Sequence, residues 1–258
     1  MATLTLEALP LQSRSRTRSA EYVRSIFERE MGVTLHNAQV GSPRDEAMRE
    51  LTKTTTNLYA KRVLRELIQN AFDGAAGAEE ARILVRLDRR VGAYGTLYVA
   101  NSGAGFTPAN VDAISNPALS NKRPGNFIGH KGLGFRSVEL LSDDTQIFSV
   151  AADDRSGAAA FDGFCFKFAA PEDERSWLEE SGETAYADMV IGRTHRLQLP
   201  IPIAQDPPDV EAFARLGLPR SSVCRCATPS PPSARSRKCA CSLTRRRRLL
   251  SSSTGYHP

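Results

Sequence analysis

The order of apolar and polar positions predicts helices in the first part of the chain and strands after them. Apolar side chains recur at helical spacing over residues 20–31 and again over 58–72. Ser19 is expected to cap the first helix and Gly32 to end it. The polar residues at about 33–56 should connect the two helices. The second helix is expected to bury one apolar stripe, formed by Leu64, Leu67, Ile68, Ala71 and Phe72.

Runs rich in β-forming residues follow these helices. Residues 82–88 and 96–100 flank a glycine-containing turn, a pattern that predicts an antiparallel hairpin. Further strands are expected at 145–151, 163–169 and 188–199. Together with the helices, these runs predict an α+β fold in the form of a two-layer α/β sandwich with a mostly antiparallel sheet.

The segment between the hairpin and the later strands contains both a helix signal and a loop signal. Thr107 followed by Pro108 is typical of a helix start, a capping residue before proline at the first helical position. Residues 116–127 contain Pro, Gly and Asn with little periodicity, so we expect a mobile loop there. A helix is expected to resume after Gly134.

The composition changes past about Leu218. Residues 219–258 hold nine of the 34 Lys and Arg residues and none of the 29 Asp and Glu, so residues 1–218 carry a net charge of −4 although the whole chain has +5. This Ser-, Pro-, Arg- and Cys-rich tail is expected to be disordered, and it also resembles an out-of-frame reading of a GC-rich gene. The expected organisation is a flexible arm over 1–18, one domain over 19–218, and the tail.

Composition and motifs exclude some classes of function. The sequence has no apolar run of membrane-spanning length and no signal-peptide core, which favours a cytoplasmic location without membrane contact. The acidic body does not favour nucleic acid, although the arginine run at 245–248 leaves nonspecific binding as an alternative to a solvated charge run. Four cysteines of the tail form a C-x-C…C-x-C pattern, for which a zinc site is the less favoured explanation. Zinc knuckles usually have two to four residues between paired cysteines, and these pairs have only one. The four cysteines are Cys224, Cys226, Cys239 and Cys241.

The segment RELIQNAFDG, residues 65–74, places two acids and an amide on an otherwise apolar helix. Helical spacing brings Glu66, Asn70 and Asp73 to one side of it. A solvated face is the usual explanation for such a set, and a nucleotide site with a metal ion is the alternative.

Two glycine clusters favour the nucleotide site. They are NSGAGF at 101–106 and GHKGLGF at 129–135. Glycines expose backbone N–H groups where a side chain would block a phosphate, and the second cluster leads into a predicted helix whose N-terminus favours an anion. A Rossmann fingerprint does not fit, because no strand directly precedes the second cluster, and the chain contains no P-loop sequence.

In order and spacing, these pieces resemble the GHKL nucleotide-binding family of gyrase-type topoisomerases, a heat-shock chaperone, MutL-type repair proteins and sensor histidine kinases. ELIQNAFD, NSGAGF and GHKGLGF followed by RSV match its motifs, with particular likeness to the sacsin-like, chaperone-type branch. The resemblance covers residues 55–150 and implies a Bergerat-type fold that binds ATP and Mg²⁺ and acts with a partner or client protein. The second acid of the first motif argues against a histidine kinase.

The resemblance implies a role for each residue of the first motif. Asn70 would ligate Mg²⁺ through its side-chain oxygen, a hard ligand for a hard cation. Glu66 would orient the attacking water or accept a proton from it. Asp73 would support the nucleotide near the base and ribose.

The glycine clusters would hold the two ends of the nucleotide. Asn101 stands where the family has an aspartate that accepts a hydrogen bond from the adenine amino group; its amide is uncharged and could flip to present a donor. Gly103 and Gly105 would let the backbone pass close to the base. The phosphates would be bound by Gly129, Lys131, Gly132, Leu133, Gly134 and Phe135.

The resemblance also implies a moving part. Residues 107–128 would form a lid, with Lys122 and Arg123 approaching the phosphates when it closes. The second domain that completes hydrolysis in the family would fall at or beyond Leu218. The sequence therefore leaves two activities open: a weak ATPase that couples nucleotide state to lid closure and a partner protein, or a non-hydrolysing, nucleotide-sensing fragment of a larger ATPase.

Overall fold

The computed structural model describes residues 11–58, 61–76, 78–116, 134–151, 161–215 and 222–227. The α-helices are α1 (Leu11–Gln39), α2 (Arg44–Leu58), α3 (Val63–Gly74), α4 (Pro108–Ser115), α5 (Pro171–Ser181), α6 (Ala187–Val190) and α7 (Pro208–Arg215). The 3₁₀ helices are η2 (Phe135–Leu140), η3 (Thr184–Tyr186) and η4 (Arg196–Gln198). The strands are β1 (Ile83–Asp88), β2 (Thr96–Asn101), β3 (Asp144–Ser149), β4 (Cys165–Phe168), β5 (Pro200–Pro202) and β6 (Ser222–Ala227).

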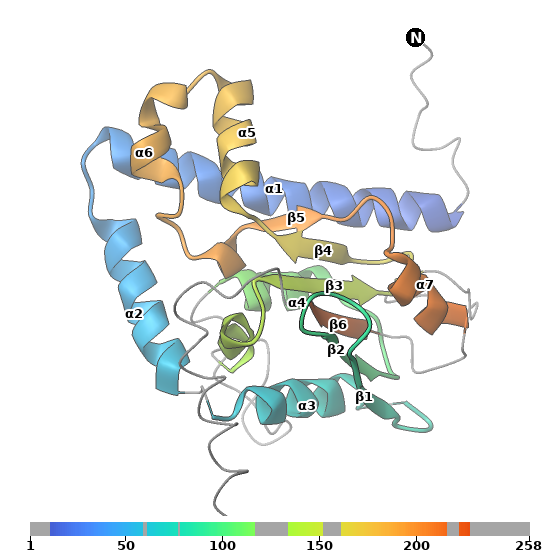
Figure 1. The fold of residues 1–258 in the computed structure, drawn as a ribbon. Helices are drawn as coiled ribbons and strands as arrows, with labels where there is room; N and C mark the ends of the chain where they lie inside the picture. Colours follow the sequence, from blue (N-terminus) through green and yellow to red (C-terminus); the bar gives the residue numbers. More distant parts are fainter. Residues whose placement is uncertain are drawn as a thin grey trace, which may run out of the picture.

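The strands form one antiparallel sheet in the order β1-β2-β6-β3-β4-β5. Figure 1 shows α1 running along β5, while α3 lies beside β1 and β2. Helices α2 and α7 lie at opposite sides of the view. The predicted α+β class with an antiparallel sheet is confirmed.

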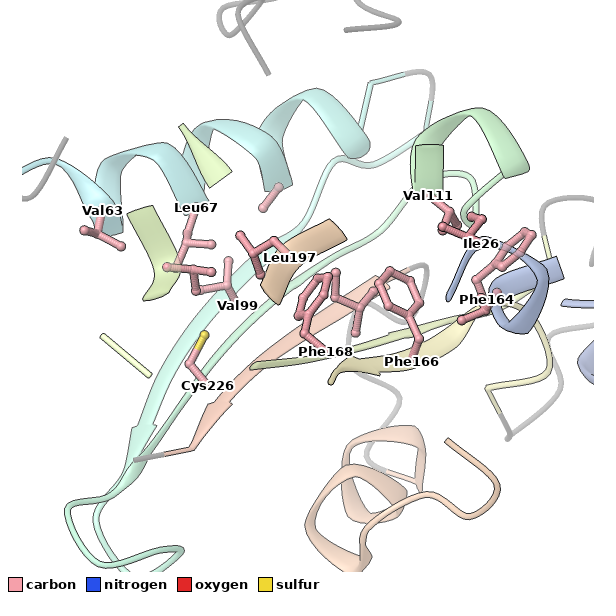
Figure 2. Close-up of a cluster of buried hydrophobic side chains, with 14 residues drawn as sticks. Ile26, Val63, Leu67, Val99, Val111, Phe164, Phe166, Phe168, Leu197 and Cys226 are labelled. Carbon is pink, nitrogen blue, oxygen red and sulfur yellow. The ribbon is translucent and has the colours of Figure 1, made fainter. Parts of the chain in front are cut away.

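Alternation along the strands divides the core between the two faces of the sheet. On one face, Val99 of β2 and Cys226 of β6 pack against Leu67 of α3. Figure 2 shows Val63 and Leu67 pointing from α3 toward these strands. The other face carries Tyr98, Phe148 and Val223, which pack against Phe161 and Val210. The first face is the one that positions α3.

The helices before α3 are longer than the sequence predicts. Helix α1 begins before Ser19 and runs through Gly32, so residues 11–18 are not a flexible arm; residues 1–10 lie outside the described part. It continues because Met31 and the residues after it pack against α5 and α6. The predicted connection at 33–56 instead contains most of α2, where Thr52 donates to the carbonyl of Met48 one turn earlier.

The predicted buried stripe of α3 is partly wrong. Leu67 and Ala71 are buried as predicted, together with Val63, but Leu64, Ile68 and Phe72 are exposed. The side that faces the sheet is therefore rotated from the predicted stripe toward the side that carries Asn70.

Several local predictions are confirmed. Strands β1 and β2 pair as an antiparallel hairpin, β3 overlaps the run predicted for it, and β4 lies within its predicted run. Helix α4 begins at Pro108, and its N-cap Thr107 donates its N–H to Asn110 Oδ1 at 2.8 Å. The helix expected after Gly134 is the short 3₁₀ helix η2. The loop predicted at 116–127 lies outside the described residues except for Asn116.

The strand predicted at 188–199 is wrong. This segment contains the end of α6 and the 3₁₀ helix η4. Its buried residues Val190 and Leu199 pack with α1 and α5, whereas Leu197 joins the core beneath α3. In a strand, Leu197 and Leu199 would point to the same face because they are two residues apart, whereas the turning path directs them into different clusters.

The expected disorder of 219–258 is wrong for residues 222–227, which form β6 between β2 and β3. Alternation places Val223 on one face and Cys226 on the other, both buried. The charge of Arg225 is neutralised because its guanidinium lies 2.8 Å from Asp209 Oδ2 and 3.4 Å from Asp144 Oδ2. Residues 228–258 lie outside the described residues, so the out-of-frame hypothesis for them stays a prediction.

Candidate functional site

Helix α3 presents its polar side chains beside its buried side. It packs against β1, β2 and η2, with Leu67 and Ala71 directed into the core. Glu66 and Asn70 are half-buried, and Asp73 is only 8% exposed. These three residues therefore do not form the fully solvated face that is the usual explanation for such a set.

The end of α3 touches the end of β2. Gly103 has φ +120°, and a Cβ there would overlap the carbonyl oxygen of Gly74, so only glycine permits this approach. A Cβ on Gly74 would lie 3.0 Å from Asn101 Nδ2. The contact places the first glycine cluster beside the C-terminal end of α3.

Asn101 is held in one orientation. It is only 4% exposed, and its Nδ2 donates to the carbonyl oxygen of Ser102 at 2.8 Å. A flipped amide would place Oδ1 against that carbonyl, oxygen against oxygen, so Oδ1 is fixed as the accepting end. This orientation removes the objection that Asn101 could present a donor to adenine.

The start of η2 touches the first turn of α3. A Cβ on Gly134 would overlap Glu66 Oε2, so the Glu66 carboxylate lies directly over the last glycine of the second cluster. The carbonyl of Gly134 accepts hydrogen bonds from Ser137 Oγ at 2.6 Å and from Ser137 N at 3.2 Å. The structure thus brings together one acid of the first motif and one glycine of the second cluster.

Two other residues predicted to bind nucleotide, Gly105 and Phe135, are packed within the fold. A Cβ on Gly105 would overlap the carbonyl of Val150, so this glycine permits close packing beyond the end of β3. Phe135 packs on the core beneath α3, with its ring 6.4 Å from that of Phe168. The remaining predicted residues lie outside the described part of the chain: Lys122, Arg123, Gly129, Lys131, Gly132 and Leu133.

On helix α3, Asn70 offers an amide oxygen, a hard ligand of the kind that Mg²⁺ accepts. No group of three His, Cys, Asp or Glu side chains suited to a metal ion occurs among the described residues. Mg²⁺ usually keeps several waters and takes only one or two protein ligands beside substrate phosphates. A single half-buried amide oxygen, from Asn70, is consistent with that mode of binding.

The sequence did not assign a role to a buried polar cluster next to η2. Arg136 is 1% exposed and lies 3.2 Å from His195 Nδ1, and His195 Nε2 lies 3.0 Å from Glu139 Oε2. The sequence contains one signal for this polar cluster, because Arg136 directly follows the second glycine cluster. Its partner His195 is distant in sequence and carries no motif.

A cavity of about 300 Å³ opens beside this cluster, and Glu139 and His195 are among its lining residues. It is bounded by α2, η2 and the segment 192–196, with Lys53, Glu139 and Arg196 among its lining residues. The described lining includes none of the residues predicted to bind nucleotide, so the cavity is separate from the site around α3.

Comparison with known proteins supports the assignment of the motifs. Residues 56–174 match a family model described as histidine kinase-, DNA gyrase B-, and HSP90-like ATPase. The chain is also 30% identical over 133 residues to "Protein NO VEIN" of Arabidopsis thaliana; the alignment covers 50% of this chain and 4% of that protein. The chain thus corresponds to a small part of this relative's length. Among the described helices, none has the length and apolar character needed to cross a membrane.

Proposed function

We propose that this chain is a Mg²⁺-dependent ATP-binding module of the histidine kinase-, DNA gyrase B-, and HSP90-like ATPase type, because residues 56–174 match the family model with that description. The observation that carries the proposal is the meeting of three segments around α3. Asn101 lies at the C-terminal end of the helix, and Gly134 lies against Glu66 in its first turn. In the proposal, the residue that accepts from the base and the glycine that faces the phosphates thus lie against opposite ends of the same helix.

In this proposal each end of ATP meets a different element. The fixed Oδ1 of Asn101 accepts from the adenine amino group, and the buried carboxylate of Asp73 supports the base and ribose. The phosphates lie toward Gly134, where η2 begins and backbone N–H groups are available. Bound Mg²⁺ would neutralise phosphate charge, and Asn70 would hold it one helical turn from Glu66.

Hydrolysis would be weak and would depend on Glu66. Its half-buried carboxylate, beside the start of η2, has the chemistry to orient a water or accept its proton. Closure of residues 107–128 as a lid and coupling to a partner protein complete the proposal, in the manner of a sacsin-like, chaperone-type module in the cytoplasm. These steps come from the motif resemblance, and the alternative is a module that senses ATP without hydrolysing it.

The test is calorimetric titration of ATP and GTP, with and without Mg²⁺. Wild type should prefer Mg–ATP, and Asn70→Ala should weaken Mg–ATP binding about tenfold or more, as expected for loss of an interaction worth 1.4 kcal/mol. Asn57→Ala, an exposed asparagine on α2, is the matched control and should bind as wild type does. Equal, metal-independent affinities in wild type and Asn70→Ala would contradict the site.

Phosphate release in the same samples decides between the two activities. Glu66→Ala should keep Mg–ATP affinity within a few fold and abolish release. A wild type that binds Mg–ATP and releases no phosphate would instead be the non-hydrolysing module.

A further inference from the structure

Arg136 is a buried cation with incomplete compensation. Its side chain is 1% exposed, and its Nε has no hydrogen-bond partner among the described residues. Within the same part of the chain no carboxylate forms an ion pair with it, and burial lowers the pKa of Arg136 to about 10. Burying a charge in this way costs stability, so an apolar side chain of similar size would serve the core better.

The guanidinium of Arg136 connects η2 to the end of α4. Nη2 donates to the carbonyls of Ile114 and Ser115 at 3.3 Å each, which are the last two residues of α4. Helix α4 has no basic residue in its own last turn. Arg136 therefore satisfies carbonyls that the helix leaves open and places a positive charge at its negative end.

A second pair of residues fixes the guanidinium from the other side. Nη1 lies 3.2 Å from His195 Nδ1, and because arginine only donates, Nδ1 must be the accepting nitrogen. The proton of neutral His195 is then on Nε2, where it is donated to Glu139 Oε2 at 3.0 Å. Glu139 is also on η2, so His195 links two residues of that helix.

The position of Arg136 connects this arrangement to the nucleotide site. It is the second residue after Gly134, whose carbonyl is bound by the neighbouring Ser137. Any shift of η2 along α4 would therefore move Gly134 relative to the carboxylate of Glu66. A helix as short as η2 has few hydrogen bonds of its own to resist such a shift.

We infer that Arg136 is a positioning residue of the nucleotide site: by joining the end of α4 to η2, it holds Gly134 against Glu66. The inference deepens the proposed function and rests on it, because it concerns the same site. Arg136 does not touch nucleotide in this arrangement; it acts through Gly134.

The experiment compares Arg136→Met, Arg136→Lys and Arg225→Met. Arg225 is a similarly buried arginine whose side chain lies on the opposite face of the sheet, so its variant measures the general effect of replacing a buried arginine. Arg136→Met should lower phosphate release from Mg–ATP about 100-fold, the cost of a displacement near 1 Å at a reacting centre. Arg136→Lys, which keeps a charged donor, should recover part of this loss. Arg225→Met should lower the melting temperature without a comparable loss of release by the folded fraction.

A second measurement does not need nucleotide. The amide of Asn116 donates to the carbonyl of Asp112 at 2.8 Å and reports on the last turn of α4. Its hydrogen exchange should be faster in Arg136→Met than in wild type, and unchanged in Arg225→Met. If wild type binds no Mg–ATP, the proposed function fails, and this exchange still decides whether Arg136 holds α4.

The result that overturns the inference is equally direct. Arg136 would have no positioning role if the Asn116 amide exchanged at the same rate in Arg136→Met as in wild type. The same conclusion would follow if Arg136→Met lowered phosphate release no more than Arg225→Met does. Should Arg136→Met fail to fold, His195→Leu applies the same test by removing the acceptor of Nη1. It should lower release about tenfold, the value of one hydrogen bond to a charged group, and unchanged release would overturn the inference.

Discussion

Asn101 illustrates how a single side chain can fit a site in spite of a departure from the usual motif. The resemblance places an aspartate at this position, and an amide there offers either an oxygen or a nitrogen. The carbonyl of Ser102 decides between them, because it accepts from Nδ2 and fixes Oδ1 as the acceptor.

Nucleotide selectivity should therefore depend on Asn101. In the variant Asn101→Leu, which has nearly the same size, no acceptor remains for the adenine amino group. ATP affinity should fall ten- to 100-fold, the value of one buried hydrogen bond. GTP affinity, measured in the same titrations, should change little because GTP lacks that amino group. A variant that keeps the wild-type preference for ATP would remove Asn101 from the base site.

The candidate residues of the proposed site are visible in the sequence, whereas the contacts that surround them are not. Glu66, Asn70 and Asp73 follow from helical spacing within one short segment, and the glycine clusters are visible as sequence motifs. The link from Arg136 to His195 is invisible in the sequence, since it depends on how η4 folds back on η2. Exposure of Leu64 and Phe72 was likewise unpredictable, because helical periodicity does not say which side of an apolar helix meets the sheet.

At the scale of elements, the local pairs were predicted and the distant ones were not. The hairpin β1–β2 and the start of α4 are specified by neighbouring turn and cap residues. Strand β6 pairs with β2 and β3, both far away in sequence. The sequence predicts a disordered basic tail around its central Arg225, because the carboxylate partners, Asp144 and Asp209, lie on other elements.

The presence of β6 predicts that residues 222–227 are needed for a stable fold and that residues 228–258 can be removed without loss of stability. A chain that ends at Ala227 keeps every strand of the described sheet, and its melting temperature should match that of the full chain. A chain that ends at residue 221 leaves β2 and β3 without the strand between them. Each buried backbone group then left unpaired costs about 1 to 3 kcal/mol, and several together exceed the 5 to 15 kcal/mol that keeps a domain folded.

Thermal unfolding followed by circular dichroism checks this prediction. The shorter chain should show no cooperative transition, or one at a much lower temperature than the chain that ends at Ala227. Identical transitions in the two chains would mean that β6 is not part of the stable sheet.

At the scale of the whole molecule, the proposed nucleotide site lies on one side of the sheet. Helix α3, the end of β2 and the start of η2 all lie on or beside the face that contains Val99 and Cys226. Helix α7 covers part of the other face through Val210. The account therefore predicts a localised effect of nucleotide, confined to the α3 side.

Amide hydrogen exchange with and without saturating Mg–ATP tests this central claim most directly. Exchange should slow in peptides that cover α3, residues 101–106 and η2, while peptides from α5 and α6 should be unchanged. Protection confined to other segments, such as α2 and residues 192–196 around the separate cavity, or binding without any change along α3, would contradict the proposed site.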